Sequence, residues 1–86
     1  MTQTLDEPVS VVVTYNAHKH RTMPRIMEWR NRVYKFSKLG FQHPVRAGRR
    51  LIHVFSVSDE VLMYRLELDT ENLMWRLKEI SDGLPD

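Results

Sequence analysis

The chain contains no cysteine, which excludes disulfide bonds, thiolate metal sites and cysteine catalysis. It has only 3 glycines and 4 prolines and no low-complexity run, so we expect an ordered domain. Its apolar runs, such as Val11–Val13, are far too short to span a membrane. Polar and acidic residues, including Asp6 and Glu7, occupy the place where a signal peptide would have its apolar segment. We therefore predict a cytoplasmic protein without a membrane partner.

Catalytic motifs are also missing. The sequence has no nucleophile elbow and no glycine-rich phosphate loop, and the acids Glu28, Asp59 and Glu60 stand alone. A set of three histidines, His18, His20 and His43, suits zinc in ligand type, but no nearby acid supports it and the surrounding cations oppose a dication. We therefore predict a protein that is not an enzyme and needs no metal or cofactor. A small metal-dependent enzyme that uses these histidines is the third class of function considered.

What the sequence does have is a strong division of charge. The net charge of +2 conceals a middle segment, residues 17–50, with ten Lys and Arg against Glu28 alone, or +9. Residues 51–86 carry three basic and eight acidic side chains, or −5, and residues 1–16 carry −2. A basic segment of this kind is typical of a surface that binds a polyanion.

The length of 86 residues predicts one domain, residues 1–86, with residues 1–7 and 82–86 as flexible ends. A β-branched run predicts a strand over Pro8–Tyr15, followed by a basic loop over 16–24. Arg25–Arg30 and Val33–Leu39 then form a predicted hairpin with Asn31 and Arg32 as its turn. That turn places Trp29 opposite Tyr34 and Met27 opposite Phe36.

A second predicted hairpin joins Val61–Leu68 to Leu73–Ile80. In the register that we expect, Leu68 lies opposite Leu73, Leu66 opposite Trp75 and Tyr64 opposite Leu77. The alternative is an α+β fold with a C-terminal helix at about 71–81, because apolar residues there also fit a 3.6-residue period. Strict alternation over Tyr64–Leu68 favours the strand.

Between the hairpins, Arg50–Val57 is apolar on both faces, which is typical of a central strand in a curved sheet. The pattern leaves open whether His53 faces the core. We predict an all-β fold: a single small antiparallel meander of about six strands, forming a curved sheet or an SH3-like small barrel. In such a meander the two basic loops, 16–24 and 40–49, emerge at the same end.

The run from Trp29 to Phe36, and the later runs Tyr64–Glu71 and Trp75–Leu77, resemble small uncharacterised bacterial all-β domain proteins. The similarity spans about residues 24–80. It implies an SH3-like or similar curved meander and brings no known activity.

The expected function is a small binding module whose ligand is a nucleic acid or another polyanion. The predicted nucleic-acid-binding residues lie in the two basic loops: Lys19, His20, Arg21, Arg46, Arg49 and Arg50. The aromatic residues Trp29, Tyr34 and Phe36 are spaced for base stacking, but their alternation with polar residues favours a place in the core. The alternative function is protein–protein interaction or homo-oligomerisation, with the strand Pro8–Tyr15 as an exposed edge.

Overall fold

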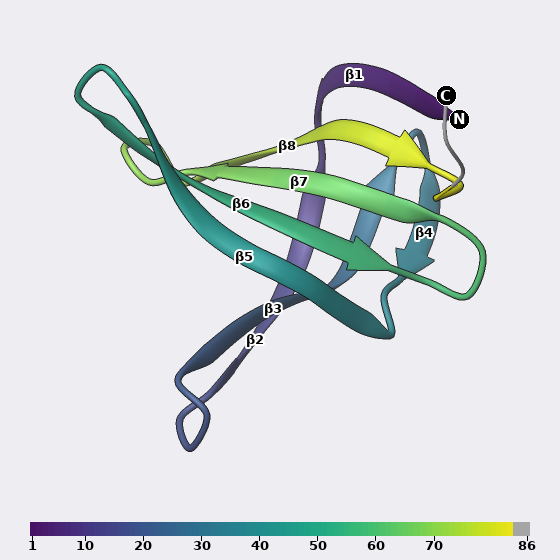
Figure 1. Ribbon diagram of the computed structural model, residues 1–86, viewed down its shortest axis with the longest axis horizontal. Helices are drawn as coiled ribbons and strands as arrows, with labels where there is room; N and C mark the ends of the chain where they lie inside the picture. Colours follow the sequence, from purple (N-terminus) through teal and green to yellow (C-terminus); the bar gives the residue numbers. More distant parts are fainter. Residues whose placement is uncertain (84–86) are drawn as a thin grey trace.

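The computed structural model describes residues 1–83 and contains eight strands, with no helix among those residues (Figure 1). The strands are β1 (Thr2–Pro8), β2 (Ser10–Asn16), β3 (Arg21–Trp29), β4 (Arg32–Lys35), β5 (Lys38–Ala47), β6 (Arg50–Ser58), β7 (Met63–Asp69) and β8 (Met74–Ser81). The predicted all-β fold is therefore confirmed. Consistent with this, the described residues include no helix long and apolar enough to cross a membrane.

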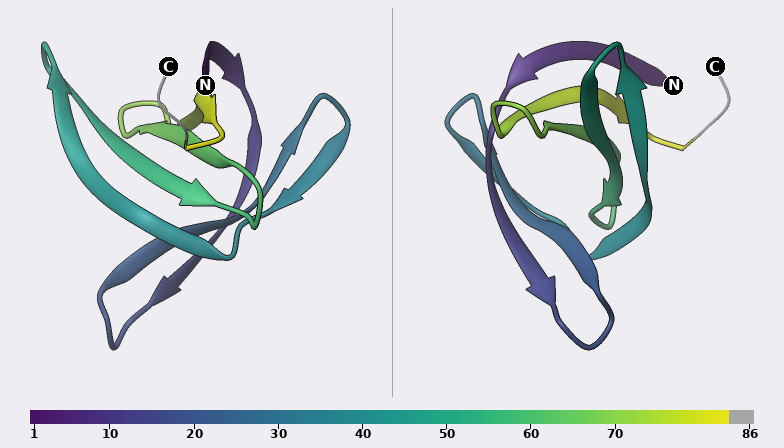
Figure 2. Two further views of the ribbon diagram at one scale, coloured as in Figure 1. Left: turned by 45° about the vertical axis from the view of Figure 1, so that its right-hand side comes forward. Right: turned by 90° about the vertical axis from the view of Figure 1, so that its left-hand side faces the viewer.

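The strands form two antiparallel sheets that fold over one another. The larger sheet has the order β1-β8-β7-β6-β5, and the smaller has the order β2-β3-β4 (Figure 2). Backbone hydrogen bonds tie the corners where the chain passes between sheets. The Val9 N–H donates to the Trp75 carbonyl at 3.2 Å, and the Ser37 N–H donates to the Ser58 carbonyl at 2.9 Å. The two sheets thus enclose a single core.

The structure has eight strands rather than about six because two predicted irregular segments are strands. Residues 2–7 of the expected flexible N-terminal end belong to β1, which pairs with β8. Most of the expected basic loop 40–49 belongs to β5, and only Gly48 and Arg49 form its turn. The expected loop 16–24 is likewise reduced to a tight turn at 17–20. Of the predicted flexible C-terminal end, residues 84–86 lie outside the described part of the chain.

The first hairpin exists, but the predicted register is wrong by one residue on each strand. Its turn is Arg30-Asn31, with φ of 52° and 63°, so that Met27 lies opposite Tyr34 and Trp29 opposite Arg32. Positive φ at both central residues is the geometry that matches the twist of a two-residue hairpin. The Arg30 guanidinium also lies 4.6 Å from the centroid of the Trp29 ring. These interactions favour the observed turn over Asn31-Arg32.

The second hairpin is also present, and the alternative C-terminal helix is wrong. Its register differs from the predicted one: Leu66 lies opposite Leu77, and Leu68 opposite Trp75. Leu73 was expected to pair with Leu68, but it lies in the turn with φ of 60° and is 71% exposed. The side-chain oxygen of Asn72 accepts the Met74 N–H at 3.0 Å, which stabilises the turn at residues 70–73, one position later than the predicted turn.

The core lies between the two sheets. Its most buried side chains come from both: Met27 from the small sheet, and Phe55, Val57, Leu66 and Leu77 from the large sheet. The three aromatic residues spaced for base stacking belong to this core: Phe36 is buried in it, and Trp29 and Tyr34 pack against it.

His53 is on the core-facing side of β6. It alternates with Phe55 and Val57, and its ring centroid lies 6.5 Å from that of Phe55. The side chain is partly buried, and its Nδ1 has no hydrogen-bond partner among the described residues. His53 therefore faces the core, a point that the sequence pattern left open.

Candidate polyanion interface

The predicted binding residues fall into two groups. Lys19 and His20 lie in the β2–β3 turn, and Arg21 is the first residue of β3. The side-chain oxygen of Asn16 accepts the backbone N–H groups of His18 and Lys19 at 3.0 and 3.1 Å, which fixes the shape of this turn. Together with Leu39, Gly40, Phe41 and Gln42 of β5, these three basic residues line a shallow depression at the free edge of β5.

The second group lies at the far end of β5. Arg46 is near the end of that strand, Arg49 is in the β5–β6 turn and Arg50 begins β6. Figures 1 and 2 place the tips of the β2–β3 and β5–β6 hairpins at separate ends of the molecule. The expectation that loops 16–24 and 40–49 meet at one end is therefore wrong. The reason is that residues 41–47 are extended, and six residues of strand span about 20 Å.

Arg50 differs from the other predicted contacts because its guanidinium is already paired. It lies 2.9 Å from a carboxylate oxygen of Asp69 and 3.3 Å from one of Glu71. Thr70 also donates its hydroxyl to the Leu51 carbonyl at 2.6 Å, so this end of β6 is held to the β7–β8 turn. Arg50 thus joins two hairpins and is less available to a ligand.

Within residues 1–83, the Lys and Arg side chains that form no ion pair are concentrated in one part of the chain. In the ion pairs of residues 1–83, the acids of β1, β7, β8 and the β7–β8 turn are matched by Arg30, Arg50, Arg65, Arg76 and Lys78. Eight other basic side chains form no ion pair within those residues, and all belong to the segment from the β2–β3 turn to the β5–β6 turn: Lys19, Arg21, Arg25, Arg32, Lys35, Lys38, Arg46 and Arg49. The acidic C-terminal part therefore leaves the basic charge of this segment largely uncompensated.

An aromatic pair on β5 was missed by the sequence analysis. The Phe41 and His43 rings are stacked, with centroids 5.3 Å apart and planes inclined by 24°, and Phe41 is 51% exposed. Gly40, Pro44 and Gly48 made this segment look like a loop. The signal that identifies it is the alternation Phe41-x-His43-x-Val45, which places three ring or apolar side chains on one strand face.

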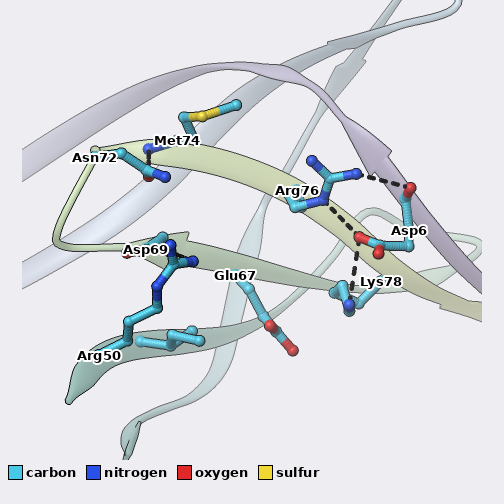
Figure 3. Close-up of a pocket in the computed structure, with 9 residues that line it drawn as sticks. Asp6, Arg50, Glu67, Asp69, Asn72, Met74, Arg76 and Lys78 are labelled. Carbon is cyan, nitrogen blue, oxygen red and sulfur yellow. Dashed lines mark hydrogen bonds and ion pairs between the residues drawn. The ribbon is translucent and has the colours of Figure 1, made fainter. Parts of the chain in front are cut away.

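A second depression lies on the outer face of the large sheet (Figure 3). Its lining includes the acids Asp6, Glu67 and Asp69 and the bases Arg50, Arg76 and Lys78, so its formal charge is balanced. Hydrogen bonds from Arg76 and Lys78 hold the pKa of Asp6 below its usual value. These ion pairs join β1 to β8 and β6 to the β7–β8 turn. The charged cluster therefore stabilises the fold.

The three histidines considered for a metal do not gather. His18 and His20 lie in the β2–β3 turn, whereas His43 stacks on Phe41 in β5. Residues 1–83 hold no group of three or more His, Cys, Asp or Glu side chains placed to bind a metal ion.

No protein-family model, curated protein or solved structure matches this chain. The resemblance to small bacterial all-β domains stays a prediction.

Proposed function

We propose that this protein is a nucleic-acid-binding module whose basic surface runs from the β2–β3 turn along β5. The observation that carries the proposal is the set of basic side chains between Lys19 and Arg49 that form no ion pair within residues 1–83, where the other basic side chains are matched by acids. Lys and Arg that face solvent without partners bind phosphates by releasing condensed counterions. Lys19 and Arg21 are the principal phosphate contacts, since they line the same depression. Arg46 and Arg49 extend the surface.

The variant that tests this proposal is Lys19→Ala with Arg21→Ala. We expect it to bind a labelled oligonucleotide about tenfold more weakly than the wild type at low salt. The dependence of log K on log salt should become shallower by about 1.4 for a single strand, because two phosphate contacts are lost. Fluorescence anisotropy over a range of salt concentrations measures both quantities.

The matched control removes two unpaired cations outside the depression, as Arg32→Ala with Lys35→Ala. Both residues are exposed on β4, so the control changes the net charge equally. We expect it to retain most of the affinity. Equal losses in the two double variants would contradict the assigned site, and no binding by the wild type at low salt would contradict the function.

A second candidate function is self-association through β2. This strand lies at the edge of the small sheet, with Val12 55% and Tyr15 63% exposed, so a second copy can add its own strand there. Light scattering after size exclusion should then report a dimer that Val12→Lys disrupts and Val61→Lys, at an exposed site outside β2, does not. A monomer at high concentration would exclude this candidate.

A further inference from the structure

The aromatic pair on β5 has the geometry of a stacking platform. Phe41 and His43 lie on the same face of the strand, opposite Ser56 and Val54 of β6. Ser56 and Val54 are both small and buried, so they support the two rings from below without covering them. About half of the Phe41 surface faces solvent, although a large aromatic ring normally stabilises a protein most when it is buried.

Close packing below the platform fixes its position. Gly40 precedes Phe41, and a Cβ at Gly40 would come 3.3 Å from the Ser56 carbonyl oxygen. The register of β5 against β6 shifts between Leu39 and Phe41, which sets the direction in which Phe41 points. The ring is thus held by a rigid sheet, while its outer face stays open.

The platform also lies between the two groups of cations. Phe41 itself lines the depression that contains Lys19, His20 and Arg21. In the other direction, β5 leads to Arg49 in the β5–β6 turn, about 20 Å from Phe41 along the strand, whereas Arg46 lies on the opposite strand face from the two rings. A flexible chain of phosphates that follows β5 would meet cations at both ends and the aromatic pair between them.

We infer that the ligand is a single-stranded nucleic acid that lies along β5, with a base stacked on the Phe41–His43 pair. This inference rests on the proposed function and names its substrate class. Aromatic side chains beside a cationic groove bind single strands because an unpaired base exposes its π face. A duplex keeps those faces stacked inside, and inorganic polyphosphate has none, so both lose this contribution.

The experiment compares a labelled oligothymidylate of about 15 nucleotides, a duplex of the same length and inorganic polyphosphate. The variants are Phe41→Leu, which keeps an apolar side chain without a π face, and Phe41→Trp, which keeps the π face. Val45→Ala is the matched control on the same face of β5, where Val45 is 41% exposed. We expect Phe41→Leu to weaken oligothymidylate binding about tenfold and to leave polyphosphate binding unchanged. Phe41→Trp and Val45→Ala should bind like the wild type.

The outcomes separate the two proposals. If the wild type binds neither oligothymidylate nor polyphosphate at low salt, the proposed function fails and this inference fails with it. If both bind, the inference alone is overturned by any of three results: unchanged oligothymidylate binding in Phe41→Leu, an equal loss for polyphosphate, or a duplex that binds as tightly as the single strand. Thermal unfolding of each variant confirms that the comparison is made between folded proteins.

Discussion

Replacing Phe55 by alanine is expected to lower the free energy of unfolding by about 3–5 kcal/mol. Phe55 is 1% exposed on β6, and its ring lies 5.3 Å from that of Trp75. The truncation removes the largest fully buried side chain and leaves a cavity that the rigid sheets cannot close. Since the total free energy of unfolding of a small domain is about 5–15 kcal/mol, this loss is a large part of it. Urea unfolding followed by tryptophan fluorescence measures the change.

The matched control for Phe55→Ala is Val61→Ala. Val61 follows β6 and is 78% exposed, so its truncation should change stability by less than about 0.5 kcal/mol. The melting temperature of Phe55→Ala should fall by at least 12 °C, at about 4–8 °C for each kcal/mol in a domain of this size. A loss below about 1 kcal/mol in Phe55→Ala would contradict the position of the core between the two sheets.

The hairpins could be predicted from the sequence, but their registers could not. In the first hairpin the predicted partners have positions that sum to 63, whereas the observed partners, such as Met27 and Tyr34, sum to 61. In the second, the sum of 141 becomes 143 at Leu66 and Leu77. A change of two in this sum keeps these side chains on their predicted faces. Beyond the register shift at Arg65 and Leu66 the sum is 144, and Ile80 packs against the core. Alternation therefore identifies the core-facing residues where the ladder is regular, while the turn selects their partners.

The two missed strands depend on contacts that are remote in sequence. β1 has little apolar alternation, and it is held to β8 by pairs such as Asp6 with Arg76, 70 residues away. β5 contains Gly40 and Pro44, which normally end strands. It is an edge strand, so the missing N–H of Pro44 is tolerated there. Local propensity alone could not detect either strand.

The candidate site was predicted in part. The basic residues were found from composition, and Lys19, His20 and Arg21 do share one depression. Their separation from Arg46 and Arg49 follows from the missed strand β5. The pairing of Arg50 with Asp69 depends on the register of β6 and β7, which alternation does not reveal. The stacking of Phe41 on His43 was also missed, because these residues were expected in a loop and not in the strand β5.

The β6–β7 turn depends on one carboxylate. Asp59 Oδ1 accepts the backbone N–H groups of Val61 at 2.8 Å and Leu62 at 2.7 Å, and Oδ2 accepts the Tyr64 hydroxyl at 3.0 Å. Burial by itself would raise the pKa of Asp59, but these three hydrogen bonds outweigh it and hold the pKa below the usual 3.8. Burial and the hydrogen bond to Asp59 raise the pKa of Tyr64. The phenol therefore remains a donor to the carboxylate.

Replacing Asp59 by alanine is expected to lower the free energy of unfolding by about 2–4 kcal/mol at pH 7. The variant loses hydrogen bonds to a charged acceptor, and it leaves the hydroxyl of Tyr64, a residue only 2% exposed, without its partner. Glu60→Ala is the matched control: Glu60 is the next acid in the chain, is exposed and forms no ion pair or hydrogen bond in the described residues. It should change stability by less than about 0.5 kcal/mol.

The pH dependence of this difference tests the charge of Asp59 directly. Because its pKa is lower in the folded protein than in the unfolded chain, its contribution is fully present above the unfolded value, near 3.8. It is lost as the pH falls through the lower folded value. The gap in unfolding free energy between the wild type and Asp59→Ala should therefore be wide at pH 7 and narrow progressively below about pH 4. A gap that stays constant down to pH 2 would show that the carboxylate charge contributes nothing, and that the turn depends on the side chain's packing alone.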